Sequence, residues 1–184
     1  MKEIMRTGII LFLICAVSAG LCGIVNSVTA PVIAENLLRE REAALAVAAG
    51  EYTVGEEVAI DTADANVAYT IMDGDEAVGY VFELNASGYG GAMNIIASYY
   101  FDGELINAEL TTNSETPGLG KRAEEPSYMD MFRGLGASSP LPVSSADLSS
   151  DDAAAVSGAT VTFTGVSTAL RNGSELAKSL GGAK

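Results

Sequence analysis

The sequence predicts an α+β protein, in which a single N-terminal transmembrane helix precedes an antiparallel-sheet domain with flanking helices. Two observations carry this prediction. Residues 8–25 form an uncharged, mostly apolar run of 18 residues, which is about the length that spans a bilayer. Beyond it, segments with the composition of β-strands follow in quick succession, at residues 67–72, 77–84, 92–101 and 104–111.

The turns between these segments favour hairpins. Asp-Gly pairs stand at residues 73–74 and 102–103, each between apolar runs. We expect two-residue turns with positive φ at both central residues, because this geometry matches the right-handed twist of the flanking strands. Past the sheet, we expect a short helix at residues 128–132, a polar loop at 138–150 and a terminal helix at 164–180.

The N-terminal region predicts how the chain meets the membrane. Lys2 and Arg6 precede the apolar run, so the positive-inside bias places the N-terminus in the cytoplasm and the main domain on the periplasmic or extracellular side. A cleaved signal peptide is the alternative, because residues 28–30 (VTA) resemble a cleavage site. The apolar run is longer than a typical signal core, and Pro31 would follow the cut. We therefore expect a retained single-pass anchor.

These features divide the chain into three parts. Residues 1–30 are the cytoplasmic N-terminus and the anchor. Residues 31–50 are a stalk helix, since strong helix formers and interleaved charges precede Gly50 as a stop. Residues 51–184 are the extracytoplasmic domain.

Composition excludes several classes of function. The chain has 10 basic and 24 acidic residues, for a net charge of −14, so it repels nucleic acid. It contains no histidine, and both of its cysteines lie in the apolar run, so we expect no functional metal site. A hydrolase that uses Ser or Thr would lack the usual histidine base, and we expect no catalytic residue.

Three short stretches could carry chemistry. Residues 157–162 (SGATVT) precede the terminal helix, where free backbone N–H groups attract a phosphate and a hydroxyl can be esterified by one. An ordinary helix cap is the alternative. Residues 115–120 (ETPGLG) supply a stiff Pro-Gly turn with one carboxylate. Residues 88–91 (GYGG) place an aromatic ring on a flexible backbone, which a bulge leading into the next strand explains equally well.

The ordered set of anchor, GYGG, ETPGLG and SGATVT resembles the FMN-binding domain of electron-transport subunits, over nearly the whole chain. The families are the G subunit of the Rnf ferredoxin:NAD oxidoreductase complex and the C subunit of the sodium-translocating NADH:quinone oxidoreductase. In its short length the chain is more similar to the Rnf G subunit than to the C subunit. Residues 26–36 (NSVTAPVIAEN) are also similar to the start of the Rnf G subunit. The resemblance implies an electron carrier that works with other subunits of an ion-translocating membrane complex.

The resemblance also implies a covalent cofactor. FMN would be joined through its phosphate to Thr160, in a phosphodiester formed by an FAD:protein FMN transferase, with Thr162 as a neighbouring hydroxyl. The other implied cofactor contacts are Ser157, Gly158 and Ala159 at the phosphate end, and Tyr89, Thr116, Gly118 and Leu119 at the ring or ribityl chain. For Glu115, a flavin contact and a salt-bridge or capping role both stay open.

Two residues depart from the family pattern. Asn113 stands where a histidine is expected, and Phe163 stands where a serine commonly follows the motif. The first bears on flavin protonation, and the second on the helix start or on recognition by the transferase. The alternative to an electron carrier is a membrane-tethered binding or adhesion module without a cofactor, whose motifs merely form turns.

Overall fold

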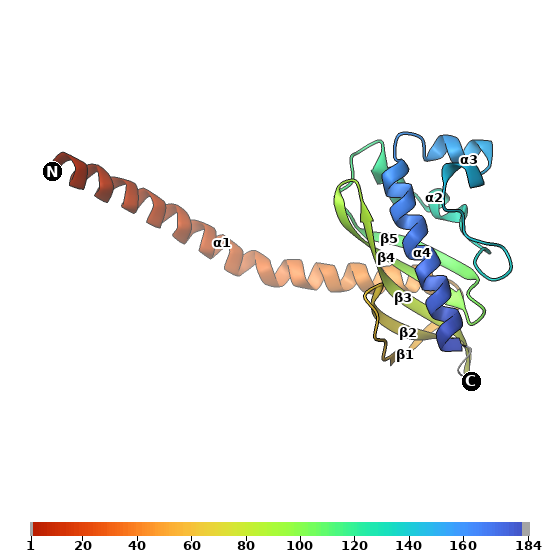
Figure 1. The fold of residues 1–184 in the computed structure, drawn as a ribbon. Helices are drawn as coiled ribbons and strands as arrows, with labels where there is room; N and C mark the ends of the chain where they lie inside the picture. The colour runs from red at the N-terminus through yellow and green to blue at the C-terminus, as the bar shows by residue number, and fades with distance from the viewer. Residues whose placement is uncertain (1, 182–184) are drawn as a thin grey trace. The chain divides into compact units, whose positions relative to one another are not determined.

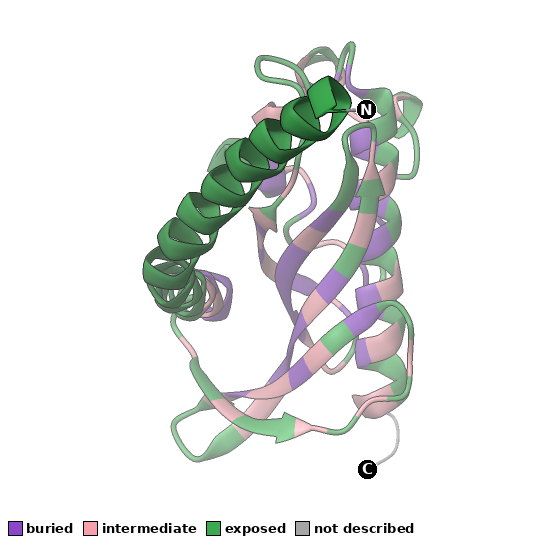
Figure 2. Cartoon of the chain, turned by 90° about the vertical axis from the view of Figure 1, so that its left-hand side faces the viewer, coloured by how far each residue is buried: buried purple, intermediate pink, exposed green. Residues whose placement is uncertain are grey.

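The computed structural model describes residues 2–181, so residues 182–184 of the predicted domain lie outside it. By its contacts the chain forms two compact units, which divide between Glu40 and Arg41. The first unit is part of one continuous helix, α1 (Lys2–Ala49), in which the predicted anchor and stalk are joined. Its residues 2–40 are exposed (Figure 2). By length and apolar composition, α1 is a candidate membrane span.

The second unit contains the predicted antiparallel sheet. Its five strands pair in sequence order, as β1 (Thr53–Val58), β2 (Ala65–Asp73), β3 (Glu76–Gly88), β4 (Gly91–Tyr100) and β5 (Leu105–Thr112). The predicted strands correspond to β2–β5, which confirms the α+β class. The sequence analysis missed β1, an edge strand with the sequence TVGEEV that is largely exposed and has no apolar alternation.

The hairpin turns differ in detail from the prediction. Gly74 has φ +59°, while no non-glycine residue among residues 2–181 has positive φ. Since Asp73 pairs with Glu76, Gly74 is the first central residue of a two-residue turn in which only that residue has positive φ, as in type II′. At the second Asp-Gly pair, Gly103 has φ +87° and its N–H donates to Tyr100 O, which is a three-residue loop with a glycine bulge.

The two faces of the sheet are covered by different helices. The terminal helix α4 (Thr160–Gly181) packs on one face (Figure 1), where Phe82, Leu84 and Ile95 meet Phe163 and Leu170 in the main core. The last turns of α1 pack on the other face, in a smaller cluster that includes Ala44, Ala48, Val81 and Ile96. Adjacent strand residues therefore point to opposite layers, as the period of two requires.

Short helical segments connect β5 to α4. They are η1 (Gly120–Glu124), α2 (Pro126–Asp130), η2 (Ser145–Asp147) and α3 (Ser150–Ala155). The predicted short helix at 128–132 corresponds to α2, which begins and ends two residues earlier. The predicted terminal helix begins four residues too late, because α4 includes residues 160–163. Three β-branched residues there disfavour a helix on propensity, but Phe163 is fully buried and stacks on Phe132 at 5.8 Å between ring centroids.

Candidate functional site

A cavity of about 500 Å³ lies where three segments meet. These segments are the turn between β3 and β4, the stretch between β5 and η1, and the first turn of α4. The lining residues are Tyr89, Glu115, Thr116, Leu119, Gly120, Gly158, Ala159, Thr160, Val161 and Thr162. The three motifs that the sequence analysis singled out are therefore brought together, although up to 74 positions separate them in the chain.

The start of α4 forms one wall of this cavity. Gly158 has φ +80° and lets the chain turn out of α3. The N–H of Phe163 donates to Ala159 O at 3.0 Å as the first bond of the new helix. The N–H groups of residues 160–162 precede that bond and have no acceptor inside the helix, so they leave a place for an anion.

The two threonines of the motif lie in different environments. Thr160 is exposed, and its hydroxyl has no hydrogen-bond partner among residues 2–181. Thr162 is only 1% exposed, and its hydroxyl donates to Glu115 Oε2 at 2.6 Å. An incoming phosphoryl group can reach the first hydroxyl, whereas the second is enclosed and its proton is already shared.

Glu115 holds the three segments together. Its carboxylate accepts the Thr162 hydroxyl from α4 and, through Oε1, the N–H of Gly90 in the hairpin turn at 2.8 Å. Glu115 is 3% exposed, and hydrogen bonds to a charged acceptor contribute about 1.5–3 kcal/mol each. Gly120 lies against the same carboxylate, where a β-carbon would contact both Glu115 and Thr162. The structure thus gives Glu115 a framework role, in addition to its place in the cavity wall.

The Pro-Gly stretch forms the turn that the sequence predicts. The N–H of Leu119 donates to Thr116 O at 3.2 Å, and Gly118 has φ +78°, as in a type II turn with Pro at the second position. Asn113 supports this turn from one side. Its Oδ1 accepts the N–H of Glu115 at 3.0 Å, and its Nδ2 donates to Glu124 Oε1 at 2.7 Å.

Aromatic residues of the core pack together next to the start of α4. Phe132 lies between Phe163 and Tyr128, with centroid distances of 5.8 and 6.4 Å. Burial raises the pKa of Tyr128; the charge of Arg122 opposes this effect, and the smaller influence of the Glu115 charge adds to it. The phenol is therefore a neutral, buried part of the core. Phe163, the departure from the family pattern, is a core residue that fixes the start of α4.

The cavity suits a ligand with a flat apolar part. Among residues 41–181, six large hydrophobic residues are exposed, and three of them lie on this cavity: Tyr89 at 77%, Val161 at 55% and Leu119 at 45%. Exposed apolar surface gathered in one place is typical of a binding site. Glu115 is the one charged residue among those that line the cavity in the described chain. A free phosphate dianion would therefore find backbone N–H groups here but no basic side chain.

Most of the predicted cofactor-binding residues lie together at this cavity. Eight of the ten predicted cofactor-binding residues line the cavity, whereas Ser157 and Gly118 do not. Gly118 shapes the turn without lining the cavity, and Ser157 is exposed to solvent. Gly120 and Val161 line the cavity but were not predicted. Gly120 ends the ETPGLG motif, so its signal was present, while an exposed valine in a helix has no sequence signal. The GYGG stretch forms a tight turn rather than the bulge that was one explanation of it, since Gly88 pairs with Gly91.

The fold and the site define a class: an N-terminal apolar helix joined to an α+β domain whose cavity pairs a helix N-terminus and an exposed hydroxyl with apolar walls. Two family models match the chain. The FMN-binding domain matches residues 88–175, and the RnfG N-terminal region matches residues 1–47. The chain belongs to the family of RnfG-type proteins that carry an FMN-binding domain.

Relatives with assigned names point the same way. The chain is 28% identical to the G subunit of the proton-translocating ferredoxin:NAD(+) oxidoreductase complex of Clostridium ljungdahlii, over 63% of this chain and 62% of the relative. It is 31% identical to the G subunit of the ion-translocating oxidoreductase complex of Yersinia pestis, over 67% of this chain and 65% of the relative. The matches thus span less than two thirds of these two relatives. The chain is also 27% identical to the G subunit of the Na(+)-translocating ferredoxin:NAD(+) oxidoreductase complex of Acetobacterium woodii. This match covers 92% of this chain and 89% of the relative.

Proposed function

We propose that this chain is a subunit of an ion-translocating, Rnf-type ferredoxin-linked complex, and that it relays electrons through FMN attached covalently to Thr160. The observation that carries the attachment is the contrast between two hydroxyls at one helix start. Thr160 is exposed at the cavity, whereas Thr162 is buried and donates to Glu115. When bound, FMN supplies reversible electron transfer.

The charge of the site supports a covalent link. Among residues 2–181, the lining of the cavity has an acidic residue and no basic one, so a free phosphate monoester of about two negative charges lacks a counter-charge there. A phosphodiester carries one negative charge and cannot dissociate. The free N–H groups of residues 160–162 then suffice to stabilise the linked phosphate.

The rest of the lining would hold the cofactor in place. Gly158 and Ala159 shape the phosphate end, next to Ser157. Thr116 and Leu119, on the turn that Gly118 permits, would contact the ring or the ribityl chain, and Tyr89 would lie against the ring. Glu115 positions these segments and contributes its carboxylate to the wall. The chain itself needs no acid–base residue for this role, because the protein supplies position and surroundings.

The proposed membrane arrangement uses α1 as the anchor. Residues 1–30 contain the anchor, residues 31–50 the stalk, and residues 51–184 the domain. With Lys2 and Arg6 ahead of the apolar run, the N-terminus lies in the cytoplasm and the domain faces the periplasm or the exterior. An FAD:protein FMN transferase would load the domain on that side, and the partners in electron transfer would be other subunits of the complex.

Denaturing electrophoresis under ultraviolet light tests the attachment. The full chain is co-expressed with a transferase whose activity is established on another substrate, beside Thr160→Ala, Thr160→Ser and Thr162→Ala. We expect a fluorescent band for the wild type, Thr160→Ser and Thr162→Ala, and a dark band for Thr160→Ala. Mass spectrometry of the peptide that contains residues 157–162 locates the added mass.

Each other outcome contradicts a defined part of the proposal. A dark band for Thr162→Ala alone would place the bond two residues later. A dark wild-type band would refute the flavin carrier and leave the cofactor-free binding module. Near-ultraviolet circular dichroism of each variant shows whether a dark band reflects a lost acceptor or a lost fold.

A further inference from the structure

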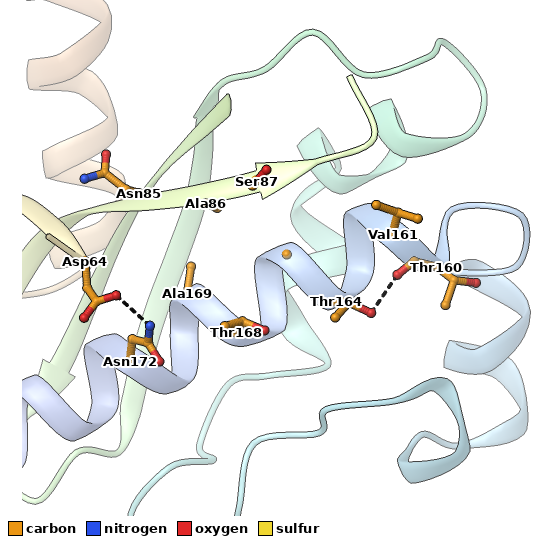
Figure 3. Close-up of a pocket in the computed structure, with 11 residues that line it drawn as sticks. Asp64, Asn85, Ala86, Ser87, Thr160, Val161, Thr164, Thr168, Ala169 and Asn172 are labelled. Carbon is orange, nitrogen blue, oxygen red and sulfur yellow. Dashed lines mark hydrogen bonds between the residues drawn. The ribbon is translucent and has the colours of Figure 1, made fainter. Parts of the chain in front are cut away.

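A second cavity shares Thr160 with the first. It is a groove of about 530 Å³ between α4 and the end of β3 (Figure 3), and Thr160 and Val161 line both cavities. A group attached to the Thr160 hydroxyl therefore starts at the boundary between two cavities. Both volumes lie in the range of small-molecule sites.

The groove follows one stripe of α4. Thr160, Thr164, Thr168 and Asn172 recur at every fourth position and follow one another along the helix in Figure 3. Twelve residues of α-helix span roughly 18 Å. The groove therefore runs away from the attachment point over a length on which an extended ribityl chain and a tricyclic ring can lie.

Helix α4 lies close to strand β3 along the groove. Gly165 faces the carbonyl of Ser87, and a β-carbon at this position would contact that oxygen. Ala86 and Ala169 supply the remaining apolar floor. Small residues on both elements thus leave room above the strand that larger side chains would fill.

Polar groups converge at the far end of the groove. Asn172 Nδ2 donates to Asp64 Oδ1 at 2.8 Å (Figure 3). A carboxylate has about four acceptor sites, and an amide has two donors and an acceptor, so both groups retain capacity. This end complements a ring edge that alternates acceptors and an N–H donor, which is the pyrimidine edge of a flavin. Ser87 and Thr168 line the groove closer to Thr160 (Figure 3), and their hydroxyls have no hydrogen-bond partner among residues 2–181.

We propose that this groove is a second binding position for the flavin ring tethered at Thr160, with its pyrimidine edge at Asp64 and Asn172. The inference rests on the proposed attachment. A tether presents the ring to both cavities at high effective concentration. The first cavity offers the apolar surfaces of Tyr89, Leu119 and Val161, and the groove offers polar partners. The ring alternates between them, and so presents itself on two sides of α4.

Time-resolved flavin fluorescence of the loaded full chain in detergent micelles tests this proposal. A tyrosine in contact with a flavin quenches its emission, and Tyr89 lines only the first cavity, while the groove has no aromatic lining residue in the described chain. We expect a short lifetime from the first cavity and a long one from the groove. Tyr89→Leu should remove the short component.

A substitution that fills the groove provides the decisive comparison. Thr168 is exposed on α4, so Thr168→Met should fold and should reduce the amplitude of the long component several-fold in favour of the short one. The matched control is Ser179→Met, also exposed on α4 but beyond the groove, which should leave both amplitudes unchanged. Thr168→Ser keeps the groove open and should behave like the wild type.

The outcomes separate this inference from the function it rests on. A wild-type chain without covalent flavin on a denaturing gel overturns both. A loaded chain with a single lifetime overturns the second position alone. The same holds if Thr168→Met matches Ser179→Met, because the long component then comes from a ring in free solvent.

Discussion

The hydroxyl of Thr162 donates to the buried carboxylate of Glu115 at 2.6 Å, although 47 positions separate the two residues. This bond joins the first turn of α4 to the stretch that precedes η1. Because it engages one of the two threonine hydroxyls of the motif, it also distinguishes Thr162 from Thr160 as a chemical group. The bond between Thr162 and Glu115 therefore has two effects: it joins two segments of the site, and it leaves Thr160 as the free threonine hydroxyl for the proposed attachment.

Replacing Glu115 tests the framework role. Glu115→Ala leaves the Thr162 hydroxyl and the Gly90 N–H without their acceptor. We expect the free energy of unfolding to fall by about 1–3 kcal/mol, since the buried Thr162 donor that loses its partner costs about that much, while Gly90 is exposed. Guanidinium unfolding of the full chain in micelles, followed by tyrosine near-ultraviolet circular dichroism, measures it. The control Glu125→Ala is exposed nearby and should change stability by less than about 0.5 kcal/mol; equal effects would refute the framework role.

The two threonines should respond in opposite ways. Thr162→Val removes the donor to Glu115, so we expect a loss of about 1–3 kcal/mol in unfolding free energy with covalent flavin retained. Thr160→Val removes an exposed hydroxyl, so we expect a change below about 0.5 kcal/mol with covalent flavin lost. Unfolding and in-gel fluorescence are measured on the same preparations. A stability loss at Thr160 comparable to that at Thr162 would contradict the assigned environments.

The fold was predictable where local signals agree with the packing. The strands β2–β5 carry apolar patterns bounded by turn residues, and all four were predicted. The edge strand β1 has no such pattern, because its pairing with β2 places few of its side chains in a core. The start of α4 was missed for the opposite reason. The stacking of Phe163 on Phe132 overrides a poor local propensity, and a contact over 31 positions leaves no local signal.

The site was predictable from motifs, but its internal roles were not. Residue types gave the glycines, the hydroxyls and the carboxylate. They could not show which threonine is buried, because Thr160 and Thr162 are identical in type and two positions apart. They also left the role of Glu115 open, and the bonds to Thr162 and Gly90 add a framework role that no local pattern indicates. The groove had a signal that was not used, namely the four-residue spacing from Thr160 to Asn172 on a helix.

A single methyl group should test the close approach of α4 to β3. Gly→Ala in a helix interior normally stabilises by about 0.5–1 kcal/mol. At Gly165 the new β-carbon would contact the carbonyl oxygen of Ser87, so we expect a loss of about 1–3 kcal/mol instead. The same unfolding measurement decides the sign, with the exposed neighbour Thr164→Ala as the comparison. A stabilised Gly165→Ala would show that the helix can move away from the strand.

The free energy of unfolding, measured as pH is lowered, tests the support that Asn113 gives to the turn. The hydrogen bond from Asn113, together with that from Lys121, lowers the pKa of Glu124 below its ordinary value of 4.5. A lowered folded-state pKa contributes stability that is present above the unfolded pKa and is lost as pH falls through the folded value. Asn113→Ala should therefore be less stable than the wild type at pH 7, and the difference should shrink as pH falls below about 4.5.

A double-mutant cycle isolates this dependence from the other bond of Asn113. The bond from the N–H of Glu115 to Asn113 Oδ1 involves no titrating partner atom, so its loss costs the same at each pH. With Glu124→Gln as the background, the effect of Asn113→Ala should be independent of pH between about 3 and 7, because no carboxyl remains at position 124. Unfolding at several pH values measures all four chains. A difference between wild type and Asn113→Ala that stays constant down to about pH 3 would show that Asn113 acts on the turn alone and leaves the pKa of Glu124 unchanged.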